Sequence, residues 1–163
     1  MSCTELIYFN DKGEYIKEES VKNAWLGAFQ IWKRLFEKYY PNGNWNEEMY
    51  TNYCKNVWNL TDNFNLTDTE KICLFYTYDY ALIERKNINR LISALKEYHK
   101  EEDSLLEQAE LIEKSFLDTE IEYLGTHQNS ISCSFWYDNN CLKDKNGWLI
   151  FNESEINNNS EEK

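Results

Sequence analysis

The sequence predicts an α+β fold, with about four to five helices packed against a small antiparallel sheet formed mainly by the C-terminal third. Three observations support this prediction. The 31 residues from Asn87 to Leu117 include no glycine or proline and carry apolar side chains at helical spacing. A capping-box pattern begins at Thr67 and indicates the start of another helix. After Leu117 the apolar period shortens from 3.6 toward two residues, as in strands.

The N-terminal part of the chain predicts a hairpin followed by a helix. Leu6 to Phe9 and Glu14 to Ile16 flank a turn in which Gly13 can adopt a positive φ. A helix from about Glu19 to Tyr40 is expected next, and Pro41, the one proline in the sequence, marks its end. Its apolar face would consist of Val21, Ala24, Trp25, Ala28, Ile31, Trp32, Leu35 and Tyr39.

The middle of the chain predicts two further helices. Apolar spacing favours a helix from Asn46 to Leu60, and the Asn-rich and Asp-rich segment from Thr61 to Leu66 is typical of a loop. Thr67 and Glu70 then form the capping box, in which each side chain accepts a backbone hydrogen bond from the other residue. This pattern favours a central helix from Lys71 to Arg85.

The stretch from Asn87 to Leu117 permits two interpretations. Its apolar seam continues along the whole segment, which favours a single long helix. Ser104 and Glu107 match a second capping box, however, so two helices that break between Glu101 and Asp103 are the alternative. We favour one helix. The seam residues are Ile88, Leu91, Leu95, Tyr98, Leu105, Ala109, Ile112 and Phe116.

The C-terminal third predicts three strands and a tail. Thr119 to Leu124, Ile131 to Tyr137 and Gly147 to Phe151 are rich in β-formers, and the turn-forming residues Gly125 to Asn129 separate the first two. An antiparallel meander is the simplest arrangement, which the N-terminal hairpin would extend. Residues 152–163 are polar and rich in Asn, Ser and Glu, so we expect a disordered acidic tail after a single α+β domain over residues 1–151.

Composition narrows the range of functions. The formal net charge is −12, which disfavours direct binding to nucleic acid or to anionic membranes and favours a basic protein or nucleoprotein partner. The first residues lack the pattern of a secretory signal, and no window is apolar enough to span a membrane. Five scattered cysteines fit reduced thiols better than a disulfide framework, so the expected location is the cytoplasm.

The excess acidity is concentrated in one segment. Residues 1–100 hold 14 acids and 13 bases, whereas residues 101–124 hold nine acids and one base. A solvated helix face that maintains solubility explains this pattern most simply. The functional alternative is that these acids form a docking surface for a basic partner. The residues expected to bind that partner are Asp103, Glu107, Glu110, Glu113 and, as an aromatic anchor on a strand, Trp136.

No sequence motif identifies a reaction, a metal site or a cofactor. The chain lacks a Gly-rich phosphate loop, a Cys-x-x-Cys pair and a Gly-x-Ser-x-Gly motif, so no cofactor, metal or catalytic residue is predicted. A Cys-His pair of His127, which we place in a hairpin turn, and Cys133 is the enzyme alternative. Self-association of the long helix in a bundle is a further alternative, because its seam also suits a coiled coil.

These observations favour a small acidic binding protein over an enzyme. The hypothesis is a stoichiometric inhibitor that uses its acidic surface to occupy the basic site of a macromolecular partner. Two forms fit this description equally well. One is a phage anti-defence protein directed against a nucleic-acid-targeting enzyme, and the other is an immunity protein against a toxin.

Overall fold

The computed structural model of the protein describes residues 3–22, 27–40, 57–129 and 149–151. Within these ranges the chain forms five α-helices and a five-stranded sheet, which confirms the predicted α+β class. The elements in chain order are β1 (Cys3–Phe9), β2 (Tyr15–Lys22), α1 (Ala28–Tyr39), the 3₁₀ turn η1 (Val57–Asn59), α3 (Leu60–Asn63), α4 (Asp68–Tyr76), β3 (Ala81–Glu84), the 3₁₀ turn η2 (Arg85–Asn87), α5 (Ile88–Tyr98), α6 (Leu105–Ser115), β4 (Tyr123–Asn129) and β5 (Leu149–Ile150).

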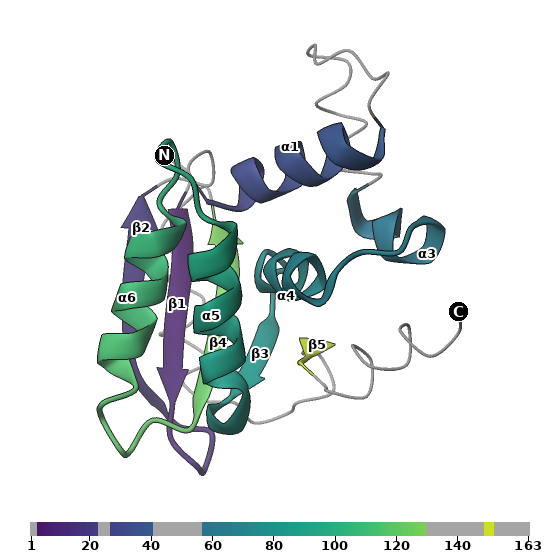
Figure 1. Ribbon diagram of the computed structural model, residues 1–163. Coiled ribbons are helices and arrows are strands. Elements are labelled where there is room, and N and C mark those ends of the chain that lie inside the picture. Colours follow the sequence, from purple (N-terminus) through teal and green to yellow (C-terminus); the bar gives the residue numbers. More distant parts are fainter. Residues whose placement is uncertain (1–2, 23–26, 41–56, 130–148, 152–163) are drawn as a thin grey trace.

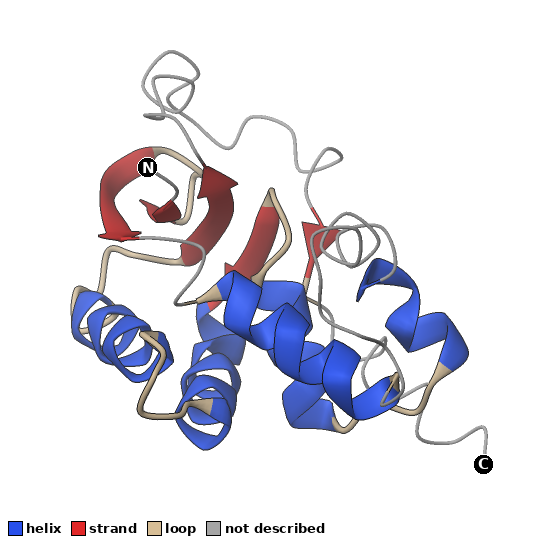
Figure 2. Cartoon of the chain, turned by 90° about the horizontal axis from the view of Figure 1, so that it is seen from above, coloured by secondary structure: helices blue, strands red, loops and turns tan. Residues whose placement is uncertain are grey.

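The described helices lie on one side of the sheet, where α5 and α6 run side by side (Figures 1 and 2). Leu6 and Tyr8 of β1 and Leu124 of β4 are fully buried toward these helices. The ring of Tyr8 meets that of Phe116 at a centroid distance of 5.9 Å. Ile7 belongs to a smaller buried cluster on the other side of the sheet. The side chains of β1 are therefore buried on both faces, which explains its continuous apolar run.

The sheet is not formed mainly by the C-terminal third, and this part of the prediction is wrong. Its strand order is β2-β1-β4-β3-β5, with β1 antiparallel to both β2 and β4. The N-terminal hairpin therefore supplies two of the five strands. Strand β3 pairs antiparallel with β4 and parallel with β5. The predicted turn at Gly125 lies inside β4 instead, with Gly125 opposite Ile7 and Leu82.

The N-terminal hairpin forms as predicted. Gly13 has a φ of 76°, and the Asn10 side chain accepts hydrogen bonds from the backbone N–H groups of Lys12 and Glu14. Strand β2 continues to Lys22, however, where the sequence predicts the start of a helix. Pairing with β1 buries Val21 on the helix-covered face, and this tertiary contact overrides the local helical pattern.

The predicted helix from Lys71 to Arg85 is correct at its start and wrong at its end. The capping box forms, since the Thr67 side chain accepts from the Glu70 N–H and the Glu70 carboxylate accepts from the Thr67 N–H. Helix α4 ends at Tyr76, and Tyr80 then adopts a positive φ of 60°. Residues Ala81–Glu84 form β3, because pairing with β4 fixes their conformation.

The stretch from Asn87 to Leu117 forms two helices, so the preferred prediction of one helix is wrong. Helix α5 ends at Tyr98, α6 begins at Leu105, and the two helices pack against each other. The apolar seam is continuous because both helices use it against the same core. Continuity of a seam therefore does not prove continuity of a helix.

Several predictions fall wholly or partly outside the described residues. They are Ala24 and Trp25 of the first predicted helix, the first part of the helix from Asn46 to Leu60, the strand from Ile131 to Tyr137 with Trp136 and Cys133, the start of the strand from Gly147 to Phe151, and the tail over residues 152–163. The predicted loop from Thr61 to Leu66 is partly helical, since α3 covers Leu60–Asn63.

The capping box provides a test of how strongly local sequence supports α4. Thr67→Ala removes the side chain that accepts from the Glu70 N–H, so we expect the free energy of unfolding to fall by about 1 kcal/mol. Urea unfolding followed by circular dichroism measures the change. Thr119→Ala is the control, because Thr119 is exposed, and it should change stability by less than about 0.5 kcal/mol. Equal stability of the two variants would contradict the assigned cap.

Candidate functional site

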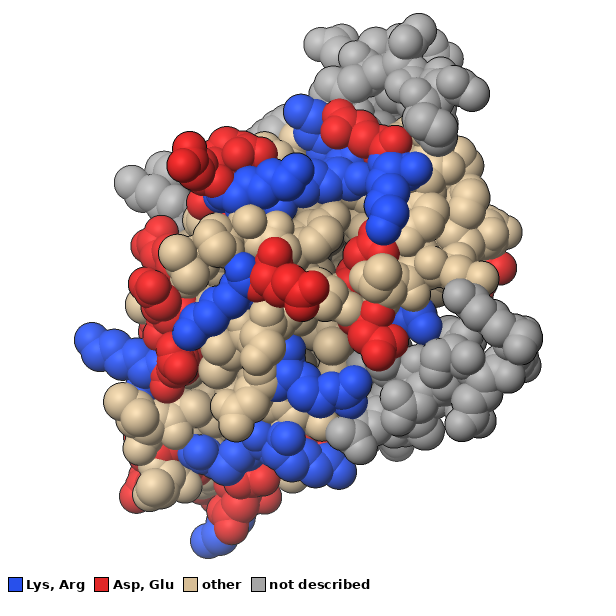
Figure 3. Space-filling view, viewed as in Figure 1, with Lys and Arg blue, Asp and Glu red and all other residues tan. Residues whose placement is uncertain are grey.

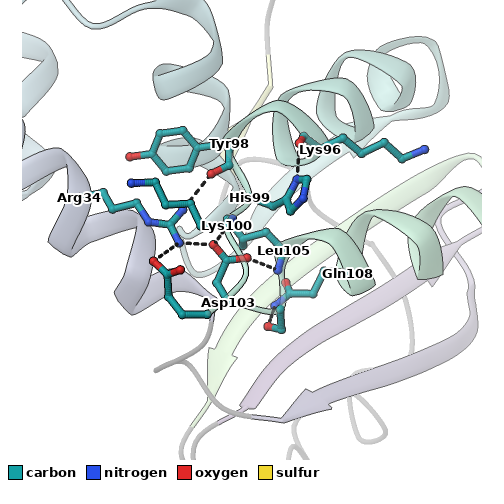
Figure 4. Close-up of polar contacts among 10 residues, drawn as sticks. Arg34, Lys96, Tyr98, His99, Lys100, Asp103, Leu105 and Gln108 are labelled. Carbon is teal, nitrogen blue, oxygen red and sulfur yellow. Dashed lines mark hydrogen bonds and ion pairs between the residues drawn. The ribbon is translucent and has the colours of Figure 1, made fainter.

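The turn between α5 and α6 is organised by the carboxylate of Asp103 (Figure 4). One of its oxygens accepts from the Leu105 N–H at 3.0 Å, and the other accepts from the Lys100 N–H at 2.9 Å. The second oxygen also accepts from the Arg34 guanidinium. Asp103 thus satisfies a donor at the first residue of α6, and its negative charge suits the positive end of the helix dipole.

The predicted capping box at Ser104 does not form. The Ser104 hydroxyl accepts instead from the side-chain amide of Gln108 at 2.9 Å, and Ser104 makes no side-chain cap. Gln108 is fully buried, and its carbonyl oxygen accepts from the Tyr76 hydroxyl. The Ser104 hydroxyl thus binds Gln108, whose buried hydrogen bond with Tyr76 joins α6 to α4. The Glu107 carboxylate is left without a capping role.

Asp103 lies inside the protein and not on its acidic surface, so the sequence-based expectation of an exposed side chain here is wrong. Its side chain is 0% exposed, and that of its partner Arg34 is 10% exposed. The guanidinium also donates to the Tyr98 carbonyl oxygen at 2.8 Å and lies over the Tyr98 ring at 5.4 Å. One arginine of α1 therefore holds the end of α5 and the start of α6.

Three of the predicted acids do share an exposed surface, which we call the α6 acidic face: Glu107, Glu110 and Glu113. Glu113 pairs with Lys96 of α5 at 2.9 Å, and the Lys96 and Glu113 side chains are 40% and 56% exposed. Glu107 and Glu110 have no ion-pair partner among the described residues. Acidic side chains gather along the edge of the molecule that α6 forms (Figure 3). Trp136, the predicted aromatic anchor, lies outside the described residues.

A second candidate is a cavity of about 430 Å³ between α1, the start of α4 and the end of α5. It is lined by Arg34, Lys38, Thr67, Thr69, Glu70, Glu97, Tyr98, His99 and Lys100. Arg34 pairs with Asp103, and Lys38 pairs with Glu70 at 3.1 Å. These ion pairs already neutralise two of the lining cations, so the cavity has little charge left with which to hold an anion.

Glu70 is a nearly buried acid that lines this cavity. Burial of its carboxyl group acts to raise the pKa, but hydrogen bonds from the Thr67 N–H, the Tyr39 hydroxyl and the Lys38 ammonium outweigh burial and lower the pKa below its ordinary 4.5. Its carboxylate occupies the position at the N-terminus of α4 that an external anion would otherwise take. The contacts explain a structural role for Glu70.

The far side of the sheet carries a third polar cluster. Glu5 of β1 is only 5% exposed and accepts from the Cys3 thiol at 2.9 Å and from the Ser20 hydroxyl at 3.1 Å. Its partner in the register with β4 is His127. The His127 ring lies 3.9 Å from the Asp79 carboxylate, measured from Nδ1 to Oδ1. His127 therefore lies on a strand and not in the predicted hairpin turn.

Besides Asp103, sequence reasoning missed two buried charges. Glu5 occurs in an apolar strand, where an acid at an inward position is itself a signal of a polar cluster. Arg34 follows Lys33 and precedes Leu35 on an amphipathic helix, and nothing local distinguishes it from the exposed Lys38 of the same helix. Among the described residues, no group of three or more His, Cys, Asp and Glu side chains is placed to hold a metal ion.

Comparison with known proteins adds no family to this description. No protein-family model matches the chain, and searches of curated proteins and of solved structures also find no match. None of the described helices is long and apolar enough to cross a membrane.

Removal of the Asp103 carboxylate should destabilise the fold strongly. Asp103→Ala leaves the nearly buried Arg34 guanidinium without its counter-charge. It also leaves the Leu105 N–H, at the start of α6, without its acceptor. We expect the free energy of unfolding to fall by about 3 to 5 kcal/mol, measured by urea unfolding. Glu102→Ala is the matched control, because Glu102 is 60% exposed and lies 3.8 Å from the same guanidinium. The control should lose less than about 1 kcal/mol, and a similar loss in both variants would refute the role of Asp103.

The lowered pKa of Glu70 predicts a dependence of stability on pH. Because folding favours its charged form, Glu70 contributes stability above pH 4.5, and this contribution is lost as the pH falls through the lower folded-state pKa. Glu70→Gln should therefore be less stable than the wild type at neutral pH, and the difference should shrink in acid. Unfolding measured from about pH 7 to about pH 3 tests this. Glu37→Gln, at an exposed site on α1, should show no such convergence.

Proposed function

We propose that this protein is a stoichiometric binding protein that inhibits a macromolecular partner by occupying its basic site with the α6 acidic face. The proposal rests on the observation that Glu107 and Glu110 are exposed and have no ion-pair partner among the described residues. The two acids are three residues apart on one helix and repel each other. A basic partner would relieve this repulsion on binding, which no ion pair among the described residues does.

The distribution of charge supports binding over general solubility. Solubility needs only a net charge, which could be spread over the whole surface. Nine acids and one base lie within residues 101–124, against 14 acids and 13 bases within residues 1–100. A concentrated field steers a basic partner toward α6 and speeds the encounter, with a strong dependence on salt.

The contacts of Asp103 narrow the proposed surface to the outer side of α6. Asp103 already binds Arg34 inside the protein, so it orients the helix and does not contact a partner. Glu107 and Glu110 form the centre of the proposed surface. Glu113 lies at its border toward α5, where Lys96 offsets its charge. The exposed Lys96–Glu113 pair is weak enough to exchange for a partner cation.

The partner we propose is a basic protein or nucleoprotein. A phage anti-defence protein against a nucleic-acid-targeting enzyme and an immunity protein against a toxin would both use an acidic surface to block a basic one. Direct contact with nucleic acid is disfavoured by the net charge of −12. Self-association through this face is disfavoured too, because two copies would bring Glu107 and Glu110 against the same acids.

Charge reversal on α6 tests the proposal. The wild-type chain is used to capture its partner from the native host, and the purified partner is then titrated at low and high salt. Glu107→Lys with Glu110→Lys should weaken binding at least about tenfold at low salt and reduce its salt dependence, because both exposed acids become like charges to the partner.

The control for this test is Asp11→Lys with Glu37→Lys, which changes the net charge equally at exposed sites on the β1–β2 turn and on α1. It should retain most of the affinity. Circular dichroism confirms that both double variants fold. If the two double variants bind equally well, net charge alone governs binding and the proposed surface is wrong.

A further inference from the structure

The outer side of α6 carries exposed leucines as well as acids. Leu106 is 37% exposed and Leu117 is 78% exposed, and they are the exposed large apolar side chains of the described residues. Leu106, Glu110, Glu113 and Leu117 follow one another at steps of four, three and four residues. Residues at these steps share one side of a helix. We call these four residues the α6 stripe.

The positions of Leu106 and Leu117 distinguish them from ordinary exposed leucines. A single exposed leucine is ordinary on a soluble protein. Here both exposed leucines lie on the same stripe, one at the start of α6 and one two residues past its end at Ser115, with two glutamates between them. Leu117 follows α6 in a turn in which its N–H donates to the Lys114 carbonyl oxygen at 3.2 Å, so it stays close to the end of the helix. The stripe thus alternates from apolar to acidic and back to apolar.

We propose that the α6 stripe docks onto a cationic amphipathic helix of a protein partner. This inference rests on the proposed function and specifies the structure of the partner's basic site. At the helical rise of ~1.5 Å per residue, the eleven-residue spacing of the two leucines corresponds to about 16 Å. A second helix has the same rise, so two of its apolar residues eleven positions apart would face both leucines together. Cations between them would then face Glu110 and Glu113.

Other occupants fit the stripe less well. A second copy of this chain would place Glu110 and Glu113 near the same acids and would repel itself. A nucleic acid would be repelled by the glutamates and would leave both leucines in water. A basic groove without apolar side chains would satisfy the acids and still leave Leu117 exposed. A cationic helix with apolar residues is the occupant that complements all four side chains.

The test uses three synthetic peptides of about 18 residues, or five helical turns. The first carries two leucines eleven positions apart with lysines at the intervening positions that share the same side. The second replaces both leucines by serine and keeps the charge, and the third keeps the leucines and replaces the lysines by glutamine. Fluorescence anisotropy measures the binding of each labelled peptide to the full chain at several salt concentrations.

We expect the leucine-lysine peptide to bind at least about tenfold more tightly than the serine-lysine peptide, because burial of a leucine contributes that much or more. Leu106→Ser with Leu117→Ser in the protein should abolish this difference and leave the salt dependence unchanged. Both leucines are exposed, so these variants should fold, and circular dichroism checks that they do. The leucine-glutamine peptide should bind more weakly than the leucine-lysine peptide and with little salt dependence.

The outcomes separate the inference from the proposed function. If both lysine peptides bind the wild type equally and Glu107→Lys with Glu110→Lys weakens both, the acidic face binds cations and the role of the leucines is refuted. If no peptide binds, the inference of a cationic amphipathic helix is overturned, and the capture experiment with the native partner decides the proposed function separately. Equal binding of the leucine-lysine peptide by the wild type and the Leu106→Ser, Leu117→Ser variant would also overturn it.

Discussion

The ion pair between Arg34 and Asp103 is the contact on which the arrangement of the helices depends. It joins α1 to the turn between α5 and α6, and the same guanidinium donates to the Tyr98 carbonyl oxygen at the end of α5. Burial of two charges has a large desolvation cost, which only good geometry and further hydrogen bonds offset. Here the Asp103 carboxylate accepts backbone hydrogen bonds from Lys100 and Leu105 in addition. The pair therefore specifies one geometry for the turn.

The direction of α6 follows from that turn. Because the chain reverses after Tyr98, α6 lies beside α5 over β1 and β2 and does not extend beyond the sheet (Figure 1). Leu105, Ala109 and Ile112 are then fully buried. The opposite side of α6 faces solvent and carries its acids and its exposed leucines. A structural ion pair inside the protein thus determines which residues of α6 face solvent.

The remaining polar clusters have internal partners, which distinguishes them from the outer side of α6. Glu70 binds Lys38, Tyr39 and Thr67, and it joins α1 to the start of α4. Glu5 is bound by Cys3 and Ser20 on the far side of the sheet. The burial of Glu70 and of Glu5 is therefore explained by the contacts that each makes within the fold. Glu107 and Glu110 have no comparable contact with any described residue, and this contrast motivates their proposed role in binding.

Local sequence determined the features that depend on neighbouring residues: the hairpin turn at Gly13, the capping box of Thr67 and Glu70, and the exposure of Glu107, Glu110 and Glu113. Tertiary structure alone decided three others. Ala81–Glu84 became a strand and β2 extended to Lys22 because pairing with β4 and β1 outweighed helical patterns. Asp103, adjacent to the predicted cap Ser104, became the buried acceptor because Arg34, 69 residues away in sequence, lies beside it in the fold. No local pattern contains that information.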